Sequence, residues 1–110
     1  MSEFLDFLKH KYAYVAIGAF KPGRFNEAEQ LFVKAVSTYT EGFEGAYLLQ
    51  KPGTDEGIAI ILWDNPEDME ANRNEVHEAL IKEMGHLFAA PPETAFYEVC
   101  SEVTPKPTSA

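Results

Sequence analysis

Residues 42–70, GFEGAYLLQKPGTDEGIAIILWDNPEDME, decide the fold, because two apolar runs lie on either side of a turn and a helix start follows them. The Pro-Gly pair within 51–56 predicts a turn, so the runs at 45–50 and 57–63 are expected to pair as an antiparallel hairpin. The second run contains the unbroken apolar stretch IAIILW, whereas a strand with one face in water alternates apolar and polar residues. Both faces of that strand are therefore expected to be covered.

The segments around the hairpin continue an alternation of strands and helices. Residues 12–20 are aromatic and β-branched and predict a strand. Residues 26–39 carry apolar residues at helical spacing, and Asn26 with Glu29 resembles a capping box. A last strand is expected to begin at about Thr94.

A second helix is expected over residues 64–87, with Asp64 or Asn65 as its cap and Pro66 in its first turn. The order strand-helix-strand-strand-helix-strand predicts an α+β protein with a ferredoxin-like βαββαβ fold and an antiparallel sheet.

A second copy of the chain is the expected cover for the outer face of this sheet. The first strand also has apolar residues on both faces, with Tyr14 and Ala16 on one and Val15 and Ile17 on the other. Helices cover only one face of a ferredoxin-like sheet, and 110 residues leave no further element for the second face. We therefore expect a homodimer with two-fold symmetry, packed sheet against sheet.

Length and composition indicate one domain and argue against some partners. The chain is expected to form an N-terminal helical arm (1–11), one ferredoxin-like domain (12–103) and a flexible tail (104–110). The net charge of −9 argues against nucleic acid and against an anionic membrane surface, because both require a basic face. An acidic start and the lack of an 18-residue apolar run favour a cytoplasmic protein. The lone Cys100 excludes an internal disulfide and is expected to be buried and unreactive.

Three polar residues of the second helix suggest a catalytic site. If residues 64–87 form one helix, Asn72, Arg73 and His77 fall inside or beside its apolar stripe, where a packed helix buries no unpaired polar group. We expect them to line a pocket between this helix and the sheet. In that pocket His77 would take the proton of a phenol near neutral pH. Arg73 and Asn72 would stabilise the resulting negative charge.

The apolar stripe supplies the expected substrate-binding residues. Met69 and Val76 belong to the stripe, and both would contact an aromatic substrate. Trp63 ends the preceding strand at the expected rim of the pocket, where its ring would stack on the substrate. The site is thus expected to hold a small aromatic ligand.

An alternative interpretation of the polar residues is structural. Arg73 would reach solvent and pair with an acid such as Glu70 or Glu98. Asn72 and His77 would then only flank the stripe.

No metal or other cofactor is expected. His77 and His86 are nine residues apart, which corresponds to a rotation of roughly 900° and sets their rings on opposite sides of a helix. The sequence around them also lacks the H-E-x-x-H spacing of a zinc site.

Four segments resemble the antibiotic biosynthesis monooxygenase domain, and the likeness extends over residues 12–103. They are FKPGR (20–24), EGFEGAYLL (41–49), IILWDNPEDM (60–69) and APPETAFYEV (90–99). The resemblance implies a dimeric α/β barrel. It also implies one of three kinds of protein: enzymes that oxidise phenols or quinols with oxygen and no cofactor, haem-degrading enzymes, or proteins without known activity.

The site patterns of two member types are matched only in part. The quinone-forming type resembles this chain at Trp63, but Ala59 and Met69 stand where that type has an asparagine and a tyrosine. The haem-degrading type has an asparagine near Ala16 and a tryptophan near Ala71, and His77 does not stand at its histidine's offset.

The hypothesis that follows is a cofactor-independent monooxygenase for a small aromatic or quinol-like substrate. One alternative is a non-catalytic ligand-binding or stress-associated protein of the same fold, which requires only an apolar cavity. The other is a purely structural dimer, which requires the polar residues to be exposed. The three differ in whether polar side chains converge on an open cavity.

Overall fold

The computed structural model describes residues 11–105, which form a four-stranded sheet and three helices. In chain order the elements are β1 (Lys11–Ala19), α2 (Phe25–Val36), β2 (Phe43–Gln50), β3 (Glu56–Trp63), α3 (Pro66–Ala71), α4 (Glu75–Leu87) and β4 (Glu93–Val99). The predicted ferredoxin-like α+β fold is confirmed, with the expected second helix divided into α3 and α4. Most of the expected N-terminal arm and the last five residues of the tail lie outside the described residues, and Lys11 already belongs to β1.

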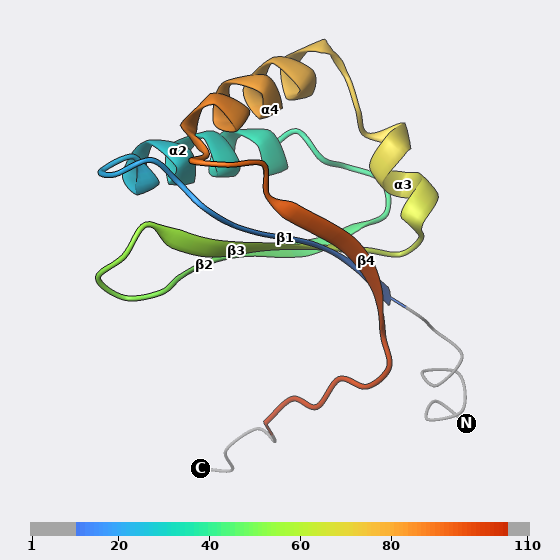
Figure 1. The fold of residues 1–110 in the computed structure, drawn as a ribbon. Coiled ribbons are helices and arrows are strands. Elements are labelled where there is room, and N and C mark those ends of the chain that lie inside the picture. The colour runs from blue at the N-terminus through green and yellow to red at the C-terminus, as the bar shows by residue number, and fades with distance from the viewer. Residues whose placement is uncertain (1–10, 106–110) are drawn as a thin grey trace, which may run out of the picture.

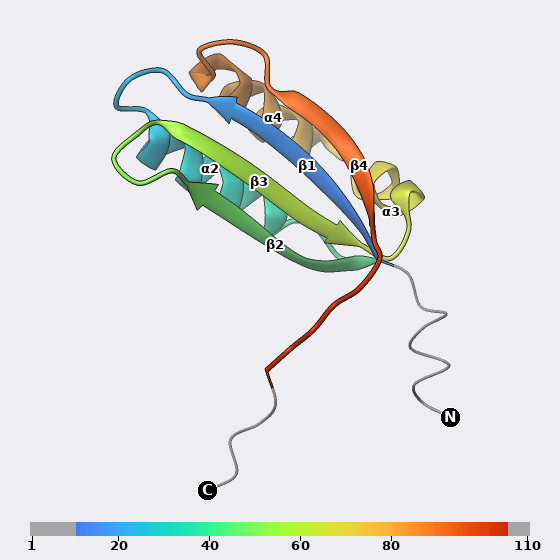
Figure 2. The same cartoon turned by 60° about the horizontal axis from the view of Figure 1, so that its bottom comes forward.

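The sheet is antiparallel, with the strand order β2-β3-β1-β4. The central strands β1 and β3 pair from Tyr12 opposite Trp63 to Ala19 opposite Glu56. Helices α2 and α4 lie over one face (Figure 1). Figure 2 shows the other face in front, with no helix of the described chain across it. The predicted hairpin of β2 and β3 is confirmed by the Lys51 N–H, which donates to the Glu56 carbonyl at 3.0 Å.

Helix α2 begins two residues earlier than the capping-box pattern predicts, and that prediction is wrong. A turn at 21–24 sets the start, since the Arg24 N–H donates to the Lys21 carbonyl and the Ala28 N–H to the Arg24 carbonyl, both at 3.0 Å. Arg24 is therefore the N-cap, and Asn26 lies inside the first turn, where its side chain does not cap the helix.

The expected single helix over 64–87 is broken at residues 72–74. The predicted start is confirmed, because Asn65 is the N-cap of α3 and Pro66 its first residue. The break arises from a second cap, the Asn74 side chain, which accepts a hydrogen bond from the His77 N–H at 2.8 Å. Asparagine often binds nearby backbone groups in this way and ends one helix while starting another. The positions of side chains around the helix axis, which were predicted for one continuous helix over 64–87, therefore do not apply to α4.

The core lies between the helices and the sheet in two clusters. One contains Phe20, Phe25, Ala28, Leu31 and Leu87. The other contains Phe32, Tyr39, Ile61 and the fully buried Trp63. Cys100 follows β4 and is exposed, so its expected burial is wrong. Within residues 11–105, no helix is long and apolar enough to cross a membrane.

We predict that Gly42→Ala destabilises the fold more than Gly53→Ala. Both glycines have φ of +77°, which costs an L-residue about 1–2 kcal/mol. A Cβ at Gly53 would meet open space, whereas a Cβ at Gly42 would overlap the carboxylate of Asp68, which accepts from the Asn65 N–H and holds the start of α3. Urea denaturation should therefore show a larger loss for Gly42→Ala by at least about 1 kcal/mol. Equal losses would contradict this close approach.

Candidate functional site

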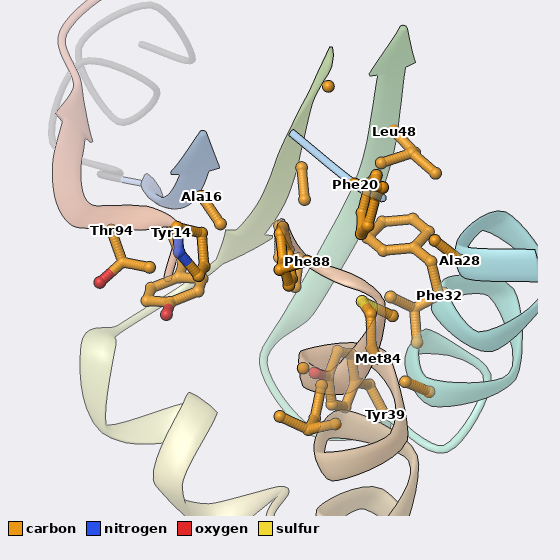
Figure 3. Close-up of a pocket in the computed structure, with 18 residues that line it drawn as sticks. Tyr14, Ala16, Phe20, Ala28, Phe32, Tyr39, Leu48, Met84, Phe88 and Thr94 are labelled. Atoms are coloured by element: carbon orange, nitrogen blue, oxygen red, sulfur yellow. The ribbon is translucent and has the colours of Figure 1, made fainter. Parts of the chain in front are cut away.

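A cavity of about 270 Å³ lies between the two long helices and the sheet (Figure 3). The space exists because small residues face one another across the layers. They are Ala16, Gly57 and Ala59 on the sheet and Ala28, Ala35 and Gly85 on the helices. Larger apolar side chains close the ends, among them Phe20, Phe32 and Phe88. A cavity shaped in this way can hold a flat apolar molecule.

The lining of this cavity is almost entirely apolar. Of the residues that line it, three carry hydroxyl groups, namely Tyr14, Tyr39 and Thr94, and none carries a carboxylate, ammonium, guanidinium or imidazole group. Across the part of the chain that the structure describes, no three His, Cys, Asp or Glu side chains gather as metal ligands. The cavity therefore favours an uncharged ligand with few polar atoms.

Tyr39 connects the cavity with a buried histidine. Its hydroxyl lies 2.6 Å from Nε2 of His77, which is 5% exposed and does not line the cavity. Tyr39 reaches this position from the turn after α2, and His77 from the first turn of α4. A buried tyrosine needs a partner for its hydroxyl, and the imidazole supplies it.

Burial keeps both members of the pair neutral near pH 7. Burial, and to a lesser extent electrostatic repulsion from the Tyr14 phenol, raises the pKa of Tyr39 to about 12. The pKa of His77 is lowered, chiefly by burial and also by the charge of Arg73, although Glu78 acts in the opposite direction. The Tyr39 hydroxyl can donate to Nε2 in the tautomer of the neutral ring that carries its hydrogen on Nδ1.

Two buried ring nitrogens around Tyr39, Nδ1 of His77 and Nε1 of Trp63, have no hydrogen-bond partner among residues 11–105. The rings of both residues lie against Tyr39, with centroid distances of 5.1 Å and 4.8 Å. A positive charge on His77 would thus have no second acceptor for its Nδ1–H, which is consistent with the lowered pKa.

Asn72 holds the two segments that carry this pair. It is 7% exposed, its Oδ1 accepts from the Thr40 N–H at 2.8 Å, and its Nδ2 donates to the carbonyls of Glu41 and Asp68. The segment with Thr40 and Glu41 directly follows Tyr39. The segment with Asp68 and Asn72 leads through the helix break to His77. The Asn72 side chain thus fixes the position of Tyr39 relative to α4.

Arg73 does not line the cavity, and its side chain is half exposed. Its Nη1 donates to Glu70 at 3.1 Å and its Nε to Glu78. These hydrogen bonds, first that of Glu78, raise the pKa of Arg73, and the same contact with Arg73 lowers the pKa of Glu78. The alternative that Arg73 pairs with Glu70 is therefore what the structure shows.

The expected substrate-binding residues also lie away from the cavity wall. Trp63 is fully buried against Tyr39 and Phe43, and Met69 packs on the same cluster. Val76 is 62% exposed, because the helix break changes the face on which it lies. None of the six residues expected at the site is among those that line the cavity. Their roles toward a substrate stay predictions.

Sequence reasoning missed Tyr39 as a site residue. It stands at the end of the apolar pattern of 26–39, where it counts as one more packing residue. The available signal was its hydroxyl, because a tyrosine at the buried end of a stripe requires a polar partner. Which residue supplies that partner depends on a contact across 38 positions of the sequence.

The fold has close counterparts among solved structures. A conserved protein from Methanosarcina mazei superposes with a TM-score of 0.72 at 14% identity, covering 81% of this chain and 92% of its own. A protein from Chloroflexus aurantiacus, provisionally named an antibiotic biosynthesis monooxygenase, gives 0.68 at 21% identity, with coverages of 87% and 97%. A mutant of SnoaB from Streptomyces nogalater, described as a cofactor-independent oxygenase, gives 0.69 at 14% identity, with coverages of 89% and 99%.

These likenesses show that the chain has the fold of the antibiotic biosynthesis monooxygenases. The expected resemblance is confirmed at the level of the fold, over most of the chain. No family model and no curated protein matches the sequence. Because one fold hosts many functions, the activity has to be argued from the cavity and its surroundings.

We predict that Asn72→Ala destabilises the protein by about 1–3 kcal/mol, because it leaves the backbone groups of Thr40 and Glu41 without their partners. The control is Asn26→Ala, which removes an exposed amide of α2 and should change the unfolding free energy by less than about 0.5 kcal/mol. Urea denaturation measures both. Similar small losses in the two variants would contradict the role assigned to Asn72.

Proposed function

We propose that this chain is a cofactor-independent monooxygenase that acts on a small phenolic or quinol-like aromatic substrate. The observation that carries the proposal is an apolar cavity that meets a buried Tyr39–His77 hydrogen bond. The fold shared with SnoaB, described as a cofactor-independent oxygenase, supports it. The cavity would bind the ring system, and the hydrogen-bonded pair would act on its hydroxyl group.

The size of the cavity favours a substrate of about two fused rings. A cavity of about 150 Å³ holds benzene, and this one measures about 270 Å³. No cationic side chain of the described residues lines it, so a carboxylate, sulfate or phosphate group would enter without a counter-charge. The substrate is therefore uncharged before the reaction.

The reaction that fits this environment is oxidation of a phenol to a quinone by molecular oxygen. The ring C–H opposite the hydroxyl becomes C=O with one oxygen atom, and the second atom leaves as water with the two displaced hydrogens. The phenol loses four electrons and O₂ gains them. His77 accepts the hydroxyl proton as the base, and its lowered pKa keeps it unprotonated near pH 7. An electron-rich phenolate then reacts with oxygen in an apolar cavity.

The test uses 1-naphthol, a two-ring phenol, and an oxygen electrode. The wild type should consume one O₂ for each 1,4-naphthoquinone formed. Ala59→Leu places a larger side chain in the cavity and should lower kcat/KM by about tenfold or more, since the ring no longer fits. Ala90→Leu, at an exposed loop position, should leave the rate unchanged.

A second candidate function is favoured by the apolar wall, namely non-catalytic binding of a small aromatic molecule. Binding of 1-naphthol that Ala59→Leu weakens, without oxygen uptake, would establish this alternative in place of the monooxygenase. Absence of binding would contradict both functions.

We further propose that the chain is a homodimer, packed through the outer face of the sheet. Tyr14 and Ala16 line the cavity, so their neighbours along β1 face the opposite way. That outer face carries a continuous apolar surface, made of Val15, Ile17, Tyr47, Leu49, Ile58, Ile60 and Tyr97. Ile17 and Tyr47 are 46% and 59% exposed in the single chain. An apolar surface of this kind on a sheet typically marks a protein interface.

The dimer prediction can be tested at the middle of this face. Ile60 lies opposite both Val15 and Tyr47, so Ile60→Glu would place a charge at the centre of the interface and should give a monomer at micromolar concentration. Val33→Glu, on the exposed side of α2, is the matched control and should leave a dimer. Light scattering after gel filtration measures the mass. A monomeric wild type would contradict the proposal.

A further inference from the structure

The base of the proposed reaction does not touch the cavity. His77 is buried behind Tyr39, and Tyr39 is the one of the two that lines the cavity wall. The 2.6 Å contact between the hydroxyl and Nε2 joins them. A proton that leaves a ligand in the cavity can therefore reach the imidazole through the Tyr39 hydroxyl.

We propose that Tyr39 is a catalytic residue that receives the proton of the ligand hydroxyl and passes its own proton to His77. This inference rests on the proposed function, because it assumes a phenolic ligand in the cavity. It assigns the contact with substrate to a residue outside the six that the sequence suggested.

The transfer involves two protons and no change in oxidation state. The ligand O–H bond and the Tyr39 O–H bond break, while a new O–H bond forms on Tyr39 and an N–H bond forms at Nε2 of His77. The products are a ligand anion, a neutral tyrosine and an imidazolium ion. Oxygen then takes electrons from the ligand anion, and the proton held by His77 ends in the water that is released.

The surroundings of Tyr39 and His77 favour a transient transfer of protons over a permanent charge on either residue. The raised pKa of Tyr39 keeps the phenol protonated, so it can donate and accept in the same step. The charged or titratable groups that act on the pair are Glu78 and Arg73 from the α4 side and Tyr14 from β1. Since Nδ1 of His77 has no hydrogen-bond partner within the described part of the chain, the imidazolium is stabilised mainly by the ligand anion and lasts only while that anion is present.

The spacing of the relay depends on neighbouring contacts. The ring of Tyr39 packs against Trp63 at 4.8 Å and against Phe43 at 5.4 Å, and these contacts do not involve its hydroxyl. Tyr39→Phe therefore keeps the packing and removes only the proton path. His77→Gln removes the basic ring nitrogen that would take the proton, and His86→Gln is its matched control because His86 is exposed on the same helix.

The experiment uses the emission of bound 1-naphthol, which becomes a much stronger acid in its excited state. It is excited at a wavelength that tryptophan does not absorb, and the ratio of anion to neutral emission reports proton transfer to the protein. The wild type and His86→Gln should show anion emission. Tyr39→Phe and His77→Gln should lower the ratio by about tenfold or more. The double variant should equal the single variants, because the two groups act in series.

Oxygen uptake provides the second readout and separates the two proposals. Wild-type turnover that Tyr39→Phe leaves unchanged, or anion emission that this variant retains, would overturn the relay and leave the proposed function standing. Anion emission that depends on Tyr39, without oxygen uptake, would support the relay and contradict the monooxygenase. If 1-naphthol does not bind, both are overturned.

Discussion

The pairing of β1 with β3 is the constraint on which the rest of the structure depends. These two central strands carry apolar side chains on both faces, and their inner faces change from large to small residues along their length. Trp63 and Ile61 fill one end, while Ala59 and Gly57 leave space toward the other. Protein interiors are otherwise packed at high density. Where small residues of the sheet face small residues of the helices, their side chains do not fill the space between the layers, and a cavity remains.

The same pairing also places apolar side chains on the outer face of the sheet. A strand that is apolar on both faces needs cover on both, and the helices of residues 11–105 lie on one face only. The cavity and the apolar character of the outer face therefore both follow from the sequence of β3. In the proposed dimer the cavity stays on the helix side, separate from the interface, so that binding of a ligand and assembly can be altered by different substitutions.

The candidate site combines an apolar enclosure with a short polar connection. Three hydroxyl groups on the cavity wall are too few to fix a polar ligand, and they suit a ring with one hydroxyl. The Tyr39–His77 pair stays neutral until such a ligand arrives, because burial opposes charge on either residue. Local electrostatics thus supply a chemical hypothesis that the fold, which is shared by proteins at 11–21% identity, does not supply by itself.

The sequence alone determined the strands, the hairpin, the ferredoxin-like order and a helix cap at Asp64 or Asn65, because these follow from local periodicity and turn chemistry. It did not determine the break after Ala71, where the side chain of Asn74 competes with a continuous helix by accepting from the His77 N–H. Whether such a local competition succeeds depends on the packing of the flanking segments, and Asn72 supplies that packing through its bonds to Thr40 and Glu41. The break turned Val76 outward. Only the tertiary structure decided that Tyr39 would meet His77, because a contact between residues 38 positions apart is fixed by how the layers pack and not by the local pattern around either residue.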